Sequence, residues 1–465
     1  MTRLKKPSVT GTDWIPRLKK LLPSGVVSDA PITCREHAGD KWFAARAPEA
    51  VVRARTRGHV VKTLQFAHRH NIPVTTRGAG YGYVGGCVPV RGGIVLSVMG
   101  LNRILEINRE DGVAVVEPGV ITKELQEQVR ARGLFYPPDP ASHAHCSIGG
   151  NIATNAGGPH CLKYGVTKNY VLGLEVVLAD GTVVRLGGRT HKNKTGFNLA
   201  DLFIGSEGML GVVTQATLRL IPHPQARACI SASYPDMKKA AAGVQAILGG
   251  GFLPSALELA DEFTLRAARE YLGSDHIPKG KAFLLVELDG SRRGLRAEGA
   301  DLQRLIRKSG GFDLTEAHGE RACEKLWDLR RQFSQSLKAT GLKKLNEDIV
   351  VPRSRLVDLF AHAHTLQRKT GIPVACFGHA GDGNIHVNLM IRADDPAQVK
   401  LSDRALDALF RQVLAWGGAI TGEHGIGLAK KPWWSLAADL PVRRLHTLIK
   451  KALDPKDLFN PGKFV

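Results

Sequence analysis

The stretch RGAGYGYVGG, residues 77–86, places glycines at positions 80, 82 and 85, the spacing of a dinucleotide-binding fingerprint. A strand-like segment, IPVTTRG (72–78), precedes it, as that fingerprint requires. The residues that follow, CVPVRGGIVLS (87–97), contain Pro89, Gly92 and Gly93 where the fingerprint needs a helix. We therefore expect no nicotinamide cofactor here. The stretch is either a plain glycine turn or a loop whose N–H groups surround an anion such as a pyrophosphate.

Two further glycine clusters favour the second interpretation. They are PPDPASHAHCSIGGNIATNAGG (137–158) and IGSEGMLGVVT (204–214), in which Glu207 is a lone carboxylate. Few apolar side chains in these segments could drive packing, so we expect their backbone to be arranged around a ligand. Three such clusters predict one large, extended cofactor that carries phosphate.

Composition is that of a globular protein: 465 residues, 43% of them hydrophobic, a length typical of about two to four domains. No apolar run is long enough to cross a membrane, and no apolar segment follows the basic start, so we expect no signal peptide and a cytoplasmic location. The seven cysteines include no CxxC pair, which argues against a disulfide framework, a zinc site or an iron–sulfur cluster.

The formal net charge of +21 would attract nucleic acid, anionic lipids or acidic substrates. The alternative is an ordinary solvated surface. The basic residues are spread along the chain without interleaved aromatics, which favours the second interpretation and predicts no nucleic-acid partner.

Periodicity predicts a mixture of helices and strands. We expect helices over 48–70 and 121–133, a hairpin over 172–186 with a type I′ turn at Asp180-Gly181, and a half-buried strand over 212–222. A linker over 222–227 precedes a region in which helical and strand patterns alternate.

Three more motifs connect these features to a known family. They are FGHAGDGNIHVN (377–388), TGEHGIGLAKKPW (421–433) and DPKDLFNPGKF (454–464). With the glycine clusters, the chain resembles the vanillyl-alcohol-oxidase/p-cresol-methylhydroxylase-type FAD proteins, in the branch of D-lactate dehydrogenase and the glycolate oxidase flavin subunit. The resemblance implies an α+β fold with an N-terminal segment (1–44), a two-subdomain FAD-binding domain (45–223) and an α+β cap or substrate domain (224–465). About residues 425–465 would pack back on the FAD domain.

The resemblance also implies which residues bind FAD. The pyrophosphate, the flavin and ribityl region, and the edges of the cofactor would contact Arg77, Gly78, Ala79, Gly80, Tyr81, Gly85, Gly86, Pro138, Asp139, Ser142, Gly149, Gly150, Asn151, Gly157, Glu207, Gly208, Val213 and Asn460. Tyr81 departs from the family pattern, which has threonine after RGAG. Residues 77–86 contain no histidine, so we expect the flavin to be non-covalent.

His379 and His386 flank a Gly-Asp-Gly turn that would bring their imidazoles together, and His386 shares one strand face with Asn388. Two core histidines that merely form hydrogen bonds are the alternative. In the resembling enzymes Glu423 adds a carboxylate, and the set His379, His386 and Glu423 is a borderline site for Zn²⁺ or Mn²⁺.

The chemistry of 2-hydroxy-acid oxidation assigns further roles. His424 is the candidate base for the hydroxyl proton, because imidazole titrates near neutral pH. Arg330 is the candidate ligand of the substrate carboxylate, since a guanidinium binds a carboxylate with two hydrogen bonds; a surface arginine is the alternative. Asn388 completes the predicted catalytic set, whereas Trp327 is expected to be a core residue.

The predicted function is an FAD-dependent dehydrogenase that oxidises D-lactate or glycolate to the 2-oxo acid. Electrons would pass to a quinone, a cytochrome, an electron-transfer flavoprotein or an iron–sulfur subunit, with peripheral membrane association left open. Asn346 stands where the D-2-hydroxyglutarate branch has a lysine, which disfavours that alternative. The other rivals are an alkylglycerone-phosphate synthase-like FAD enzyme and a non-enzymatic FAD scaffold.

Overall fold

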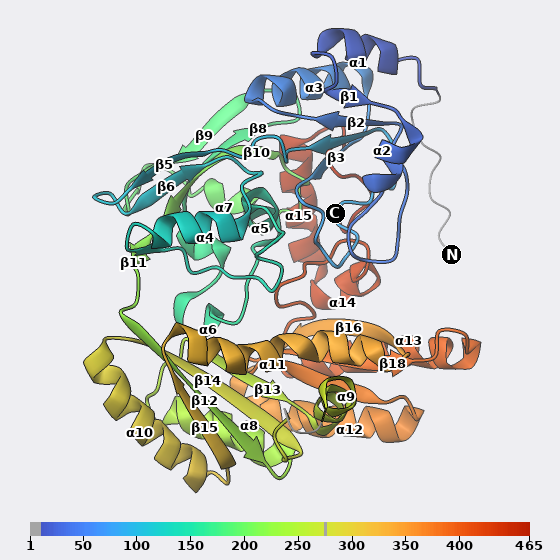
Figure 1. Cartoon of the computed structure of the whole chain (residues 1–465). Helices are drawn as coiled ribbons and strands as arrows, with labels where there is room; N and C mark the ends of the chain where they lie inside the picture. Colours follow the sequence, from blue (N-terminus) through green and yellow to red (C-terminus); the bar gives the residue numbers. More distant parts are fainter. Residues whose placement is uncertain (1–10, 274–276) are drawn as a thin grey trace. The chain divides into compact units, whose positions relative to one another are not determined.

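The computed structural model describes residues 11–273 and 277–465, which form two compact units (Figure 1). Of the described residues, unit 1 contains 11–156, 166–223 and 423–465. Unit 2 contains 157–165 and 224–422. Both units combine helices and sheets, so the predicted α+β class is confirmed.

Unit 1 has a four-stranded sheet of order β1-β2-β4-β3 and a five-stranded antiparallel sheet of order β5-β6-β10-β8-β9; β7 and β11 form a separate pair. Its strands are β1 Val27–Ser28, β2 Ala50–Arg53, β3 Val74–Arg77, β4 Ile94–Ser97, β5 Ile104–Asn108, β6 Val113–Val116, β7 Leu134–Phe135, β8 Val171–Val177, β9 Val183–Gly187, β10 Val212–Arg219 and β11 Ile221–Pro222. Its helices are α1 Ile15–Leu21, α2 Pro31–Glu36, α3 Arg57–His70, α4 Thr122–Arg130, α5 Ile148–Thr154, α7 Ala200–Phe203, α14 Trp434–Ala437 and α15 Leu440–Leu453.

The core around β2, β3 and β4 joins distant parts of the chain. It includes Trp14 and Leu18 from the N-terminal segment and Phe459 from the C-terminal segment. Phe459 forms a parallel bridge with Val74, whose carbonyl oxygen accepts the N–H of Asn460 at 2.8 Å. Residues 11–44 therefore belong to the body of unit 1 rather than to a separate segment.

The helix expected over 48–70 is wrong in its first part. Residues 50–53 form β2, and α3 begins only at Arg57, after Thr56, whose side chain accepts the N–H of His59. Ala50, Val51 and Val52 are fully buried and pair with β4. An apolar run of this length fits a strand as well as a helix, and tertiary pairing decided between them.

The predicted hairpin exists, but its turn is not type I′. Strands β8 and β9 pair from Val177 and Val183 outward, and the N–H of Leu178 bonds to the carbonyl of Thr182. Gly181 has φ +89°, whereas Asp180 does not have positive φ, which a type I′ turn requires at both central residues. The longer loop is fixed instead by Asp180, whose side chain accepts the N–H of Thr182 at 2.8 Å.

Unit 2 is built on a seven-stranded antiparallel sheet of order β15-β12-β14-β13-β17-β18-β16. The strands are β12 Ala226–Tyr234, β13 Ala256–Ala260, β14 Ala282–Gly290, β15 Phe312–His318, β16 Lys343–Val350, β17 Val374–His379 and β18 Asn384–Ile391. The helices are α6 Cys161–Tyr164, α8 Met237–Gly249, α9 Glu262–Leu272, α10 Arg292–Lys308, α11 Glu320–Ala339, α12 Leu356–Thr370 and α13 Pro396–Ala415.

Helices α9 and α11 cover one face of this sheet (Figure 1). Between them and the strands lies an apolar core that contains Trp327, Phe333 and Phe377. In antiparallel strands, directly paired residues point to the same face. This face therefore also carries a row of polar residues on neighbouring strands, and these form the candidate site of unit 2.

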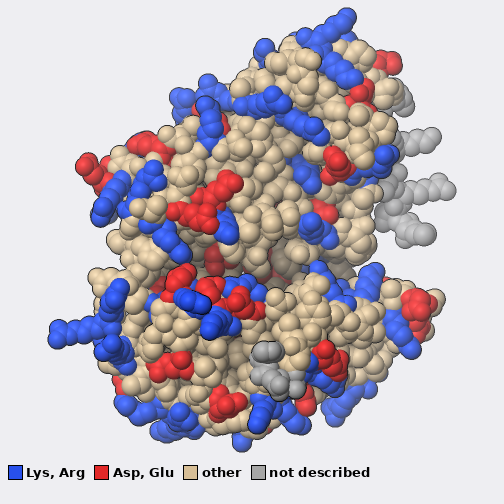
Figure 2. Space-filling model, viewed as in Figure 1, with Lys and Arg blue, Asp and Glu red and all other residues tan. Residues whose placement is uncertain are grey.

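The face of the molecule in Figure 2 has no single dominant basic patch. Figure 2 shows lysine and arginine scattered over the visible face and interspersed with acidic residues. Among the described residues, no helix is sufficiently long and apolar to cross a membrane.

Candidate functional site

Ser147 joins the first two glycine clusters in unit 1. Its Oγ accepts the N–H groups of Ala79 and Gly150, each at 3.4 Å. A Cβ on Gly78 would lie 2.6 Å from Ser147 Oγ, so only glycine allows this approach. The two loops are thus in direct contact.

The third cluster joins the same assembly through Asn460. The Asn460 side chain donates to the carbonyl oxygens of Gly86 at 2.9 Å and Glu207 at 2.8 Å. The N–H groups of Gly205 and Glu207 bond to carbonyls of α5, at Ile152 and Ala153. All three glycine clusters therefore meet in unit 1, and the C-terminal segment holds two of them together.

Glu207, a predicted FAD ligand, also holds a neighbouring loop. It is buried, and its two carboxylate oxygens accept the N–H groups of Ile426 at 2.7 Å and Gly427 at 2.8 Å. Burial raises the pKa of Glu207, an effect that these two hydrogen bonds oppose. Its carboxylate therefore anchors the loop that carries His424.

His424 lies at the start of this anchored loop. Its ring lies 5.4 Å from the ring of Tyr83, which belongs to the first glycine cluster. A Cβ on Gly427 would come within 2.3 Å of the Val84 carbonyl oxygen, so the loop packs tightly against the same cluster. The structure therefore brings the predicted base to the glycine-lined region of unit 1.

Tyr81, the departure from the family pattern, has ring partners of its own. It stacks on His145 with ring centroids 5.1 Å apart, and Lys41 Nζ lies 4.4 Å from the Tyr81 centroid. Asp40 accepts the N–H of Gly85 at 3.3 Å. Burial raises the pKa of Asp40. Sequence analysis missed Asp40 and Lys41, because it treated residues 1–44 as outside the FAD-binding domain.

Several other predicted FAD ligands have structural contacts. Asn151 is buried and donates to Thr122 Oγ1 at 2.7 Å. Gly149 packs against Pro118, where a Cβ would be 2.6 Å from the proline Cβ. Gly157 begins the short segment that belongs to unit 2. For these positions the contacts support a role in shaping the loops.

The remaining predicted ligands are distributed over the same elements of unit 1. Arg77 ends β3, Val213 lies on β10, and Gly80, Gly85 and Gly208 have φ values between +70° and +73°. Pro138, Asp139 and Ser142 lie in the segment before α5.

In unit 2, the two predicted histidines lie together. The rings of His379 on β17 and His386 on β18 have centroids 5.8 Å apart. His379 Nδ1 lies 2.6 Å from Glu258 Oε1, on β13. If Nδ1 carries the proton toward Glu258, the lone pair of His379 is on Nε2, the form that binds a metal.

Glu258 was not found from the sequence, although it is the single carboxylate in the buried strand ALELA (256–260). It is fully buried and accepts Arg330 Nε at 2.5 Å. Burial would raise the pKa of Glu258, but the charges of Arg330 and His379 and their hydrogen bonds lower it to about 2. Glu258 is therefore an ionised group that orients both side chains.

The guanidinium of Arg330 lies beside this row of polar residues, where Glu258 accepts a hydrogen bond from it. Its side chain is 11% exposed, and its guanidinium lies 4.9 Å from the Phe377 ring centroid. Only Nε is used for Glu258; neither terminal amino group makes a hydrogen bond to a residue that the structure describes. These two groups can bind a carboxylate together.

Asn388 pairs directly with Asn346 across β18 and β16. The Asn388 side chain donates to the carbonyl oxygens of Ala375 and His386, each at 3.0 Å. The side-chain oxygens of Asn388 and Asn346 are both buried without a hydrogen-bond partner in the described chain. Such orphaned acceptors are costly unless a ligand or water satisfies them.

Lys344 is a second residue that sequence analysis missed. It lies two positions before Asn346 on the same strand face, and its Nζ donates to Ser334 Oγ on α11 at 2.7 Å. Burial, with the nearby charges of Lys338 and Arg330, lowers the pKa of Lys344 to about 8. No described carboxylate pairs with it. The sequence signal was a lysine on a half-buried strand.

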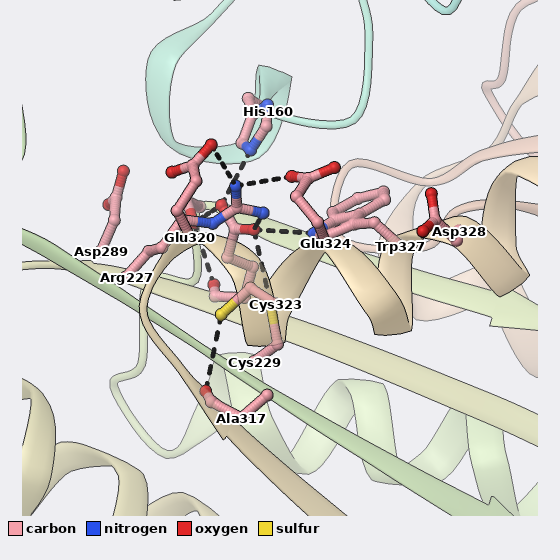
Figure 3. A network of polar contacts seen from close by, with 12 residues as sticks. His160, Arg227, Cys229, Asp289, Ala317, Glu320, Cys323, Glu324, Trp327 and Asp328 are labelled. Carbon is pink, nitrogen blue, oxygen red and sulfur yellow. Dashed lines mark hydrogen bonds and ion pairs between the residues drawn. The ribbon is translucent and has the colours of Figure 1, made fainter.

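Figure 3 shows a second polar network, in which His160, Arg227 and Trp327 are labelled. These three side chains contact the carboxylate of Glu287. It accepts Arg227 at 2.6 Å and Trp327 Nε1 at 2.7 Å, and its Oε1 lies 2.9 Å from His160 Nε2. Through His160 this network ties residues 157–165 to the sheet of unit 2. Trp327 is buried, as expected for a core residue, and its contacts show a structural role.

Asp348 organises the end of unit 2. It is fully buried, pairs with His386 across β16 and β18, and accepts Thr421 Oγ1 at 2.9 Å and the Gly422 N–H at 3.0 Å. The residue after Gly422 in the chain is Glu423. One carboxylate thus fixes the backbone from which the predicted third metal ligand continues.

Two family models together match most of the chain. The FAD binding domain matches residues 48–187, and the C-terminal domain of FAD linked oxidases matches residues 223–464.

Curated relatives are similar over most of their length. The glycolate oxidase subunit GlcD of Bacillus subtilis (strain 168) is 36% identical over 90% of this chain and 88% of its own. The D-lactate dehydrogenase of Anaerostipes hadrus is 31% identical over 97% of both chains.

Solved structures share the fold. A p-cresol methylhydroxylase with substrate bound has a TM-score of 0.79 at 19% identity and covers 99% of this chain and 98% of its own. An alkyldihydroxyacetonephosphate synthase has a TM-score of 0.76 at 20% identity, over 99% of this chain and 87% of its own. At this identity the likeness shows the fold alone.

Proposed function

Because the chain belongs to the FAD-linked oxidase family and is an FAD-dependent oxidoreductase of hydroxy acids, we propose that its substrate is D-lactate or glycolate. The product is the corresponding 2-oxo acid. The electrons leave to an acceptor other than a nicotinamide: a quinone, a cytochrome, an electron-transfer flavoprotein or an iron–sulfur subunit. The relatives' printed names, glycolate oxidase subunit and D-lactate dehydrogenase, support this choice of substrates.

The loops of unit 1 fit the cofactor. The contacts of Gly78 with Ser147 and of Gly427 with Val84 show backbone packed where side chains would intrude. We infer that the backbone of residues 77–86 and 147–150 binds the phosphates of FAD. When bound, FAD accepts the hydride that leaves C2 of the substrate.

The substrate assignment rests on the burial, orientation and unused hydrogen-bond donors of Arg330. Arg330 is largely buried, is oriented by the ionised Glu258 and keeps both terminal amino groups available. A surface arginine would not be fixed in this way. In the proposal this guanidinium binds the substrate carboxylate, and the unsatisfied side-chain oxygen of Asn388 accepts a hydrogen bond from a bound water.

His424 takes the hydroxyl proton in this proposal. Its loop is tied to Glu207 through two backbone N–H groups, so the imidazole is presented from a fixed backbone. Such a base contributes roughly 10²- to 10⁴-fold to the rate.

We further propose that His379, His386 and Glu423 bind Zn²⁺ or Mn²⁺. The two imidazoles lie together, Glu258 orients one of them, and Asp348 fixes the backbone that precedes Glu423. Two histidines and a carboxylate suit either ion. The ion would lower the cost of forming the substrate alkoxide.

Metal removal tests this part separately. Chelator treatment should slow the bleaching of flavin absorbance by substrate at least about tenfold, and added Zn²⁺ or Mn²⁺ should restore it. Bound FAD should remain unchanged throughout, because the loops proposed to bind its phosphates, 77–86 and 147–150, contain none of the proposed metal ligands. Bleaching that responds neither to chelator nor to added ions would contradict the metal assignment.

A second candidate substrate, D-2-hydroxyglutarate, is favoured by one observation. Lys344 is a partly buried cation with no described carboxylate partner and lies near Arg330. Lys344 lies on β16, the same strand as Asn346. Asn346 had disfavoured this substrate, because the D-2-hydroxyglutarate branch has a lysine at that position. A second carboxylate on the substrate would give Lys344 a counter-ion.

The deciding experiment is anaerobic mixing of the purified yellow protein with D- and L-lactate, glycolate and D- and L-2-hydroxyglutarate, while flavin absorbance is followed. We expect rapid bleaching by D-lactate or glycolate and none by the L-isomers. Bleaching by D-2-hydroxyglutarate alone would select the second candidate. If none of these acids bleaches the flavin, the proposed substrate class is wrong.

A further inference from the structure

Helix α15 (Leu440–Leu453) exposes its apolar side chains and buries a charged one. Lys450 is its one buried residue. By contrast, Leu445 is 57% and Leu448 is 64% exposed, and Leu440 and Val442 are also exposed. An amphipathic helix on a globular protein normally shows the reverse arrangement. This inversion therefore needs an explanation.

Lys450 fixes the rotation of the helix. Its Nζ donates to Asp454 at 2.6 Å and to the carbonyl oxygens of Met209 at 2.9 Å and Phe459 at 2.7 Å. Three acceptors satisfy the buried ammonium fully. Because a residue turns the helix by about 100°, Leu448 lies about 160° around the axis from Lys450. The leucines therefore cannot be buried by rotation of the helix without breaking this anchor.

The outward stripe has basic residues and no acidic ones beside it. The sequence of α15, LPVRRLHTLIKKAL, contains no Asp or Glu. Arg444 and Lys451 lie along one edge of the stripe, and neither forms an ion pair or hydrogen bond with any residue in 11–273 or 277–465. Leucine on one side and unpaired cations beside it are the composition of a helix that lies in a membrane interface.

The composition of the stripe distinguishes a lipid surface from a protein partner. Protein interfaces are enriched in aromatic residues and methionine and rely on them for most of their affinity. The outward side chains of α15 are instead aliphatic: Leu445, Leu448, Val442 and Ala452. Flexible aliphatic side chains suit a fluid hydrocarbon layer, and the cations complement anionic headgroups.

We propose that α15 docks the protein on the surface of an anionic lipid bilayer. Leu445 and Leu448 enter the headgroup region, and Arg444 and Lys451 contact lipid phosphates. The helix lies in the plane of the surface, and the binding is peripheral. The inference does not depend on which hydroxy acid is oxidised.

Vesicle flotation of the FAD-loaded, full-length protein tests the proposal. We expect it to float with vesicles that contain phosphatidylglycerol and much less with pure phosphatidylcholine, and the binding should weaken with salt. The double variant Leu445→Gln/Leu448→Gln should lose at least about tenfold in affinity. Arg444→Gln/Lys451→Gln should lose about as much, but for anionic vesicles only.

Matched control variants distinguish docking through α15 from non-specific hydrophobic binding to vesicles. Leu105 and Leu253 are also exposed leucines, outside α15, so Leu105→Gln/Leu253→Gln should float like the wild type. Flavin absorbance and the thermal midpoint show that each variant is folded. The proposal is wrong if the wild type does not float, or if the Leu445/Leu448 variant floats equally well. It is also wrong if that variant turns a wild-type dimer into a monomer, since the stripe would then join two copies.

Discussion

At the residue scale, buried charges in unit 2 are distinguished by their partners. Glu258 and Glu287 are ionised because arginine and histidine compensate each of them. Lys344, which is partly buried, has only a hydroxyl partner, and its pKa is lowered. A buried charge without a counter-ion is costly and persists where function requires it. Lys344 and Arg330 are thus the charged groups of this face with capacity left for a ligand.

His424 is the first residue to test. His424→Ala should reduce substrate-driven flavin bleaching at least about 100-fold while FAD stays bound, because the proton acceptor is lost but the loops are not. Stopped-flow absorbance measures the rate, and the spectrum before mixing measures bound FAD. His318→Ala, at an exposed histidine of unit 2, is the control and should behave like the wild type. Normal bleaching by His424→Ala would exclude His424 from proton transfer.

The effect of Lys344 on stability should depend on pH. In the folded protein its pKa is lowered from 10.5 to about 8, so the cost of burying its charge is fully present below pH 8 and disappears above pH 10.5. Lys344→Met should therefore be more stable than the wild type at pH 7, by roughly 2 kcal/mol after loss of the Ser334 hydrogen bond. The difference should shrink as pH rises from 8 to above 10.5.

Thermal midpoints across this pH range measure the effect. Lys343→Met is the matched control, because Lys343 is adjacent and exposed, and its difference from the wild type should not change with pH in this way. A constant difference for Lys344→Met would show that the lysine is not perturbed. If D-2-hydroxyglutarate is the substrate, Lys344→Met should also raise its KM and leave that of D-lactate unchanged.

At the element scale, loops are held by side chains distant in sequence. Ser147 joins the first two glycine clusters, Asn460 connects the first and third, and Glu207 holds the His424 loop. Each of these contacts satisfies backbone groups that glycine-rich loops cannot pair within themselves. The loops are therefore ordered by their neighbours rather than by their own sequence.

Glu207 tests this dependence. Glu207→Ala leaves the N–H groups of Ile426 and Gly427 without acceptors and should cost about 2–3 kcal/mol of stability. It should also lower kcat, because the His424 backbone is no longer fixed. Glu207→Gln retains one acceptor and should be intermediate in both thermal midpoint and kcat. Glu298→Ala, at a half-buried glutamate of α10, is the control; a Glu207→Ala protein indistinguishable from it would refute the anchoring role.

At the scale of the whole molecule, unit 1 is completed by the last part of the chain. Residues 423–465 belong to unit 1, although they follow 224–422, the main part of unit 2, in the sequence. Phe459 is fully buried in the core around β2, β3 and β4, and the Lys463 ammonium donates to the Val88 carbonyl at 2.6 Å. The FAD-binding unit is therefore not continuous in sequence.

The variant Phe459→Ala tests how much the C-terminal segment 423–465 contributes to the stability of unit 1. Phe459→Ala removes a large side chain from a closed core and should cost about 3–5 kcal/mol, with loss of FAD on purification. The thermal midpoint and the flavin-to-protein absorbance ratio report both effects. Phe464→Ala is the control, since Phe464 is only partly buried and packs against Trp434. Equal behaviour of the two variants would mean that the returning segment is not part of the core.

The sequence by itself determined the family, the α+β class, the FAD cofactor and the closeness of His379 and His386. It could do so because glycine spacing, strand alternation and tight turns are local properties that nearby residues express. Other features depend on contacts between segments that are distant in the sequence, and only the tertiary structure decided these. It made residues 50–53 a strand, committed Glu207 to the His424 loop, and placed Glu258 and Lys344 beside Arg330. It also turned the leucines of α15 outward, because a buried ammonium can be satisfied only where acceptors from three other positions converge.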